Sequence, residues 1–80
     1  MKKTFEYRYF SLPPQDIAYL RFILESYDGL CFMRTLDNRS GVLEVAWPAS
    51  QRADAQQLLA ALQEEVALHQ IPPPEIIPPL

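Results

Sequence analysis

The most strongly patterned part of the chain is residues 17–47, IAYLRFILESYDGLCFMRTLDNRSGVLEVAW. Its first half repeats apolar residues at steps of three and four, which places them on one face of a helix: Ile17, Leu20, Leu24 and Tyr27, with Ile23 beside them. Gly29 predicts the helix stop, because a left-handed residue is sterically cheap without a Cβ atom. From Leu30 the apolar period changes to two, which is typical of strands.

The two strands that follow form a predicted hairpin whose register can be derived from its own side chains. A five-residue loop at residues 37–41, ending in a glycine that supplies a positive φ, sets Leu36 opposite Val42. The same register sets Arg34 opposite Glu44, and we interpret these two as a cross-strand ion pair worth about 0.2–1 kcal/mol. The rival interpretation makes Glu44 a catalytic acid.

This register gives the hairpin one face that suits a core and one that does not. The expected core face carries Cys31, Met33, Thr35, Leu43, Val45 and Trp47. The opposite face carries Leu30, Phe32, Arg34, Leu36, Val42, Glu44 and Ala46. A slip of one residue would bury the charged pair, so the first set is expected to face the helices.

A further strand is predicted before the helix, because residues 4–10 alternate in side-chain character. By polarity, we expect one of its faces to point at the helices: Phe5, Tyr7 and Tyr9. The opposite assignment, with Phe10 and Leu12 inside, is the alternative. Pro13 and Pro14 end this strand, and a proline in the first helical turn loses no hydrogen bond, so the helix is expected to begin near residue 14.

A second helix is predicted from Ser50, as its N-cap, to about Leu68. Its core stripe would be Ala55, Leu58, Leu59, Leu62 and Val66. His69 would then lie at the C-terminal end of this helix, where the dipole favours a cation. We prefer this role to metal binding or catalysis, because Cys31 is the only other soft candidate ligand.

The last ten residues hold five of the eight prolines, which predicts an extended tail with at most an edge strand at residues 75–77. We therefore divide the chain into one domain at residues 1–70 and a Pro-rich tail at 71–80. The tail is too apolar for a free linker, and we expect it to pack along its own domain or across a second subunit.

The order strand, helix, strand, strand, helix predicts an α+β fold of the ferredoxin-like plan, with both helices on one face of an antiparallel sheet. The fourth strand of that plan would be vestigial or missing. A right-handed crossover places the first strand beside the third, with the second strand outside. The other edge of the first strand would then be open, which proteins seldom leave uncovered.

Two resemblances accompany this pattern. Residues 17–29, IAYLRFILESYDG, with the hairpin that follows, resemble the helix-glycine-strand core of ACT-type regulatory domains. The Pro-Pro, Ile-Ala-Tyr-Leu and Tyr-Asp-Gly features resemble a family of small bacterial proteins known only as a domain of unknown function, over most of the chain. The ACT resemblance implies pairing of subunits and a small metabolite, such as an amino acid, as ligand. Residues 12–16 lack the glycine that ACT domains use for that ligand.

Composition limits the classes of function. Eighty residues make one domain, and a formal net charge of −3 argues against nucleic acid as the main partner. A single cysteine and the absence of a signal-like segment predict a cytoplasmic protein. No apolar run approaches the ~20 residues that a membrane span needs. Neither a phosphate loop, nor paired metal ligands, nor a nucleophile motif occurs, so we expect no catalytic residue, cofactor or metal site.

We therefore expect a non-enzymatic interaction or regulatory module that acts as a homodimer or binds a protein partner, with an ACT-like metabolite sensor as the alternative. The sheet face away from the helices would expose more apolar surface than a monomer of this size usually shows. The expected interface residues lie on that face, on the outside of the first helix and in the tail: Phe10, Tyr19, Phe22, Phe32, Arg34, Leu36, Val42, Glu44, Ile76 and Ile77.

Overall fold

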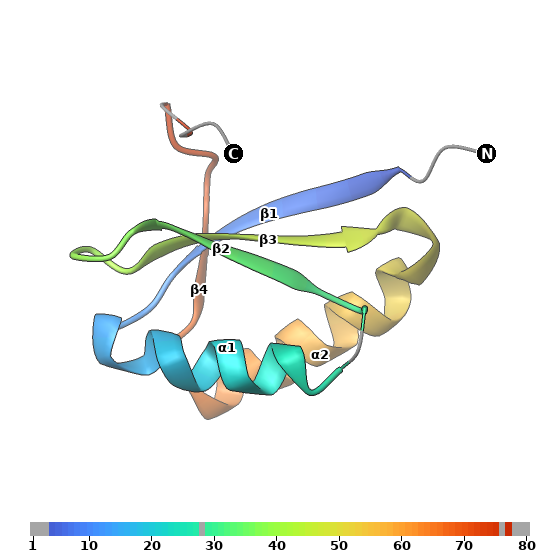
Figure 1. Cartoon of the computed structure of the whole chain (residues 1–80), viewed down its shortest axis with the longest axis horizontal. Coiled ribbons are helices and arrows are strands. Elements are labelled where there is room, and N and C mark those ends of the chain that lie inside the picture. Colours follow the sequence, from blue (N-terminus) through green and yellow to red (C-terminus); the bar gives the residue numbers. More distant parts are fainter. Residues whose placement is uncertain (1–3, 28, 76, 78–80) are drawn as a thin grey trace.

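Strands and helices follow one another in the order β-α-β-β-α-β in a computed structural model, which describes residues 4–27, 29–75 and 77 (Figure 1). The elements are β1 (Phe5–Ser11), the 3-10 turn η1 (Pro14–Asp16), α1 (Ile17–Glu25), β2 (Phe32–Asp37), β3 (Val42–Pro48), the 3-10 turn η2 (Ala49–Gln51), α2 (Arg52–Glu65) and β4 (His69–Ile71). The sheet has the strand order β2-β3-β1-β4, and every neighbouring pair is antiparallel. Both helices lie on one side of the sheet (Figure 1). The predicted α+β, ferredoxin-like fold is confirmed.

The hairpin register is confirmed along its length and differs at the loop. Arg34 pairs with Glu44 as predicted, but Asp37 rather than Leu36 pairs with Val42, because the register shifts between Thr35 and Asp37. Asp37 closes the turn: its Oδ1 accepts hydrogen bonds from the backbone N–H groups of residues 39 and 40, at 2.9 and 3.3 Å. These bonds require Asp37 at the strand end, so Leu36 becomes the extra residue of a bulge.

The face assignment of β1 was wrong, and the alternative assignment holds. Phe10 pairs with Leu43 and is only 2% exposed, whereas Tyr7 pairs with Ala46 and is 51% exposed. The tyrosines therefore lie on the face away from the helices. Polarity misled the prediction because Glu6, on the helix side, finds polar partners there that are distant in the sequence.

Both helices have boundaries that differ from the prediction. The α1 helix ends at Glu25, so Tyr27 leaves the apolar stripe and is 47% exposed, while Gly29 has the expected positive φ of +74°. The second helix begins at Arg52 after η2, and Ser50 makes no side-chain cap. It ends at Glu65, because Val66 has an extended backbone (φ −126°, ψ 163°). The exposed His69 therefore belongs to β4 rather than to a helix end.

The fourth strand forms, and it does so before the prolines. Residues His69–Ile71 pair with the last three residues of β1, whereas Glu75 and Ile77 of the expected edge strand lie outside any strand and residue 76 lies outside the described residues. Three prolines follow Ile71 and supply no N–H group for a longer ladder. The first half of β1, Phe5–Arg8, thus has no described strand on its outer side.

The core lies between the helices and the sheet. The most deeply buried large side chains are Trp47, Leu20, Leu24, Leu43, Leu68 and Val45. Both predicted helix stripes reach this core, except for Tyr27: Ile17, Leu20 and Leu24 of α1 and Ala55, Leu59 and Leu62 of α2 are buried. Packing uses the helix side of the sheet only, which leaves the other side open.

Candidate functional site

The open side of the sheet carries a shallow hollow of about 470 Å³. Its lining comes from three neighbouring strands: Phe5, Tyr7, Phe32, Met33, Arg34, Glu44 and Ala46. Because side chains alternate across a strand, the pairing of β1 and β2 with β3 places Tyr7, Phe32 and Ala46 on this same face. We call this surface the open face.

Aromatic rings form one end of the open face. The rings of Phe5 and Phe32 lie 5.9 Å apart between centroids and are tilted by 57°, the geometry that an aromatic pair prefers over a flat stack. Tyr7 and Phe32 are each 51% exposed. These rings come from β1 and β2 and meet across β3, so they form one continuous apolar patch rather than scattered side chains.

A polar group of three side chains lies next to the aromatic rings. Arg34 Nε lies 3.5 Å from Glu44 Oε1, and the Tyr9 hydroxyl donates a hydrogen bond to Glu44 Oε2 at 3.0 Å. Burial, and then the bond to Glu44, raise the pKa of the Tyr9 phenol above its ordinary value. The side chains of Arg34 and Glu44 are 26% and 12% exposed. The group is therefore a fixed, partly desolvated ion pair within an apolar surface.

The structure brings together some of the predicted interface residues and separates others. Phe32, Arg34 and Glu44 share the open face, and Leu36 and Val42 are half-buried at its hairpin end. Phe10 is buried on the opposite side. Tyr19 and Phe22 are 42% and 69% exposed on α1, Ile77 is 39% exposed, and residue 76 lies outside the described residues.

Three members of the open face were missed by the sequence reasoning: Phe5, Tyr7 and Tyr9. The sequence signal that could have identified them is the pair Phe10 and Leu12, two apolar residues at alternate positions that continue the buried face of β1 toward Pro13. Weighting that apolar continuation above the polarity of residues 6 and 8 gives the observed face.

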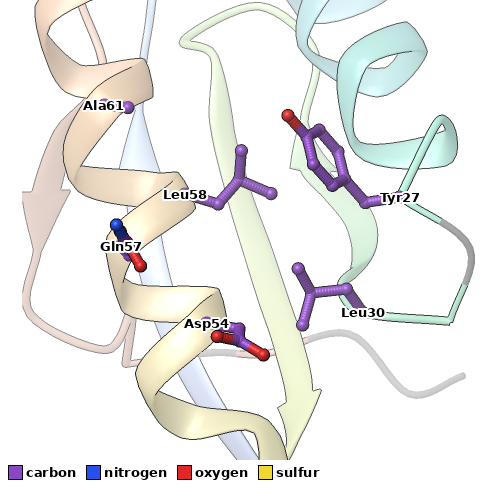
Figure 2. A pocket seen from close by; sticks show the side chains of 6 residues that line it. All are labelled: Tyr27, Leu30, Asp54, Gln57, Leu58 and Ala61. Atoms are coloured by element: carbon purple, nitrogen blue, oxygen red, sulfur yellow. The ribbon is translucent and has the colours of Figure 1, made fainter.

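A second cleft, of about 430 Å³, lies on the helix side between α2 and the connection from α1 to β2 (Figure 2). Its lining residues are Tyr27, Leu30, Asp54, Gln57, Leu58 and Ala61. Figure 2 shows Leu58 and Tyr27 projecting toward each other from opposite walls, with Leu30 across from Asp54. Leu30 and Leu58 also pack against the hydrophobic core, so the cleft has an apolar base.

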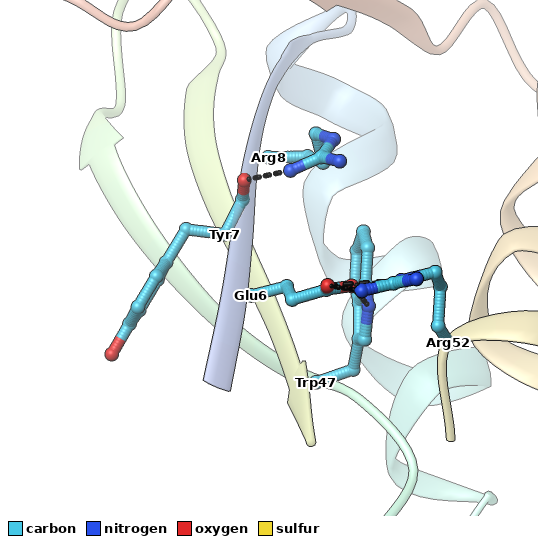
Figure 3. A network of polar contacts seen from close by, with 5 residues as sticks. All are labelled: Glu6, Tyr7, Arg8, Trp47 and Arg52. Atoms are coloured by element: carbon cyan, nitrogen blue, oxygen red, sulfur yellow. Dashed lines mark hydrogen bonds and ion pairs between the residues drawn. The ribbon is translucent and has the colours of Figure 1, made fainter. Parts of the chain in front are cut away.

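A second polar group lies where the start of α2 meets β1 (Figure 3). The Glu6 carboxylate accepts hydrogen bonds from Trp47 Nε1 and Arg52 Nε, both at 2.9 Å, and forms an ion pair with Arg52. The Arg8 guanidinium lies over the Trp47 ring, 5.7 Å from its centroid, and donates to the Tyr7 carbonyl at 2.8 Å. Each charge has a protein partner, which indicates a structural role in fixing α2 against β1.

The geometry of the described residues does not support a metal site or a reactive thiol. No three His, Cys, Asp or Glu residues of the described chain are grouped so that they could hold a metal ion. Cys31 is buried, as predicted, and burial raises the pKa of its thiol to about 11. The described helices include none that is long and apolar enough to cross a membrane.

The strand order, the helices on one side and the open face together define a small α+β domain of ferredoxin-like topology. The chain belongs to the family described as a domain of unknown function (DUF4911), whose model matches residues 10–66. The resemblance to a family of unknown function is thus confirmed, and the resemblance to ACT-type domains stays a prediction. A search of curated proteins and a search of solved structures each found no match.

Proposed function

We propose that the chain is a non-enzymatic interaction module that pairs with a second copy of itself through the open face. The observation that carries this proposal is the composition of that face, where a continuous aromatic patch adjoins a partly desolvated ion pair. Exposed apolar patches rimmed by polar residues mark interaction sites. Aromatic residues and arginine are also the residue types that are enriched in interfaces.

The two charges suit a symmetric dimer. In a two-fold interface the same surface is used by both copies, so a contact between residue i and residue j occurs twice. Arg34 and Glu44 lie side by side on neighbouring strands, and a rotated second copy brings each of them toward the opposite charge. The aromatic rings beside them supply the apolar area that drives association.

The size of the open face sets the expected strength of this dimer. The four strands have seven, six, seven and three residues. At about 3.3 Å per residue and about 4.8 Å between strands, they cover roughly 360 Å². A stable interface buries about 800 Å² on each partner, so the sheet alone supplies about half. The segment after β4 continues beyond the sheet on the side away from the helices (Figure 1). We expect Pro74 and Ile77 of this segment to enlarge the interface.

Sedimentation velocity over a range of micromolar concentrations tests the proposal. The wild-type chain is expected to sediment as a dimer, and Phe32→Glu is expected to shift it to the 9.2 kDa monomer. Phe22→Glu is the matched control, because Phe22 is also an exposed phenylalanine but lies on α1. A monomeric wild-type chain would overturn the proposal, as would dissociation by the Phe22 variant alone.

Charge reversal adds a test of the geometry. Glu44→Arg sets two like charges side by side and is expected to weaken the dimer, whereas the double variant Arg34→Glu/Glu44→Arg restores opposite charges and is expected to recover it. Circular dichroism of each variant checks that the monomer fold is kept. If the double variant stays as weak as the single one, Arg34 and Glu44 do not pair across the dimer.

A further inference from the structure

The cleft between α2 and the α1–β2 connection has features that the dimer does not use. It lies on the helix side of the sheet, away from the open face (Figures 1 and 2). Its volume of about 430 Å³ falls in the range of about 300–1,000 Å³ that small-molecule sites occupy. Such sites combine an apolar lining with a few polar groups that orient the ligand.

The lining provides that combination. Leu30 and Leu58 are half-buried, and the rest of each side chain faces the cleft. Tyr27 follows the end of α1 and is 47% exposed, so its ring forms a wall instead of joining the core. Among the described residues of the lining, Asp54 alone is charged, and its carboxylate makes no hydrogen bond or ion pair with any residue that the structure describes.

We propose that this cleft binds a small organic cation that carries an amine on an apolar body. The amine would lie between the Asp54 carboxylate, as counter-charge, and the face of the Tyr27 ring, which attracts cations. The apolar body would cover Leu30 and Leu58. An anion is disfavoured, because none of the lining residues that the structure describes is basic and the chain has a formal net charge of −3.

A simpler explanation for the aspartate at position 54 is that its charge stabilises α2. Asp54 lies in the first helical turn, where a negative charge is favoured by the dipole. That role concerns the helix alone and involves neither Tyr27 nor the cleft. It predicts a change in melting temperature on substitution and no difference between charged and neutral ligands, so the two explanations are separable by experiment.

Titration with three probes of similar shape, with NMR chemical shifts as the readout, tests the proposal. The probes are 2-phenylethylamine, the neutral 2-phenylethanol and the anionic 3-phenylpropionate. We expect 2-phenylethylamine to shift the methyl signals of Leu30 and Leu58 and the ring signals of Tyr27, and to bind at least about tenfold more tightly than the other two probes. Its affinity should fall as salt concentration rises.

Variants separate the site from general effects of charge. Asp54→Asn is expected to weaken 2-phenylethylamine about tenfold and to leave 2-phenylethanol unchanged. Glu64→Gln removes the same charge from the exposed surface of α2 and should change neither affinity. Ala61→Leu fills the cleft from its α2 wall and should weaken all three probes.

Three results would overturn the proposal. Equal affinity for the three probes would make the cleft a non-selective apolar surface. No shift at millimolar amine would mean that the cleft does not bind this class. Shifts of Tyr27 and Leu58 that depend on protein concentration without amine would show that a second copy covers the cleft.

Discussion

Arg52, the first residue of α2, places its Nε 2.9 Å from both carboxylate oxygens of Glu6 on β1, 46 residues away in the sequence (Figure 3). Trp47 donates to the same carboxylate from β3. Hydrogen bonds from Arg52, and then from Trp47, lower the pKa of Glu6 from 4.5 to about 2. The carboxylate thus joins two strands and a helix at the end of the sheet where β1 has no described outer neighbour.

The lowered pKa of Glu6 predicts a specific acid sensitivity. Because the folded state holds the carboxylate charged, its stabilising effect is complete above about pH 4.5 and is lost as the pH falls toward 2. Melting temperatures recorded by circular dichroism across this interval should fall more steeply for the wild type than for Glu6→Gln. Glu64 has an exposed carboxylate without a hydrogen bond or ion pair in the described chain, so the melting temperatures of Glu64→Gln should follow those of the wild type. Parallel curves for all three chains would contradict the prediction.

The two glycines are predicted to differ in their tolerance of alanine. Both have a positive φ, +74° at Gly29 and +73° at Gly41, which costs a residue with a side chain about 1–2 kcal/mol. A Cβ at Gly29 would meet nothing within 4 Å, whereas at Gly41 it would lie 1.9 Å from the Leu12 carbonyl oxygen. The Leu12 N–H also donates to the Gly41 carbonyl at 3.0 Å.

Urea unfolding measures this difference. Gly29→Ala should lose about 1 kcal/mol, the cost of the backbone conformation. Gly41→Ala should lose about 3 kcal/mol or more, because the loop must also move away from Leu12 and give up a hydrogen bond worth about 1 kcal/mol. Equal losses in the two variants would mean that the loop at Gly41 shifts freely.

The buried thiol of Cys31 is predicted to react slowly. Burial raises its pKa from 9.0 to about 11, which lowers the thiolate fraction about 100-fold near neutral pH. A disulfide reagent such as Ellman's reagent should therefore label the folded chain at least about 100-fold more slowly than the chain in denaturant. Ser50→Cys in a Cys31→Ala background is the exposed control and should react at nearly the same rate in both states. Rapid labelling of folded Cys31 would show that the α1–β2 region opens readily.

The elements that the sequence predicted correctly are those set by neighbouring residues. The register of Arg34 against Glu44 follows from the alternation of side chains along the two strands, which acts over few residues. The loop pairing was wrong, and the register shift between Thr35 and Asp37 confines that error to the end of the hairpin. The α1 helix likewise follows from its own apolar period and from Gly29. Its last turn could not be placed, because Tyr27 continues the period in the sequence although the helix has already ended.

The errors arose where a distant partner decides the structure. Glu6 is tolerated on the helix side of β1 only because Arg52 and Trp47 lie there, and neither is near it in the sequence. Leu68 is 2% exposed and enters the core from the extended connection after α2. Val66 lies four residues after Leu62, a spacing that imitates a continuing helix, so the strand at His69–Ile71 was not predicted. The aromatic residues of the open face were missed for the same reason, because Tyr7 was assigned to the wrong face together with the rest of β1.

The segment after β4 gives the last prediction. A chain that ends at Ile71 keeps β4 and its pairing with β1, so its monomer fold should survive. It loses Pro74 and Ile77, which belong to the segment that continues beyond the sheet on the side away from the helices (Figure 1). Burial of one isoleucine side chain contributes about 1.5–3 kcal/mol, so we expect the proposed dimer to dissociate about 10- to 100-fold more readily.

Sedimentation equilibrium of the shortened and full chains measures this change, with melting temperature at a fixed low concentration as the check on the monomer. Ile77→Asn in the full chain should reproduce much of the loss if the tail acts through that side chain. A chain ending at Gln70 also loses the Ile71 pairing with Tyr9, and should therefore lose monomer stability as well. If the chain ending at Ile71 matches the full chain in both association and melting temperature, the tail takes no part in the interface, and the proposed dimer is then limited to the roughly 360 Å² of the open face.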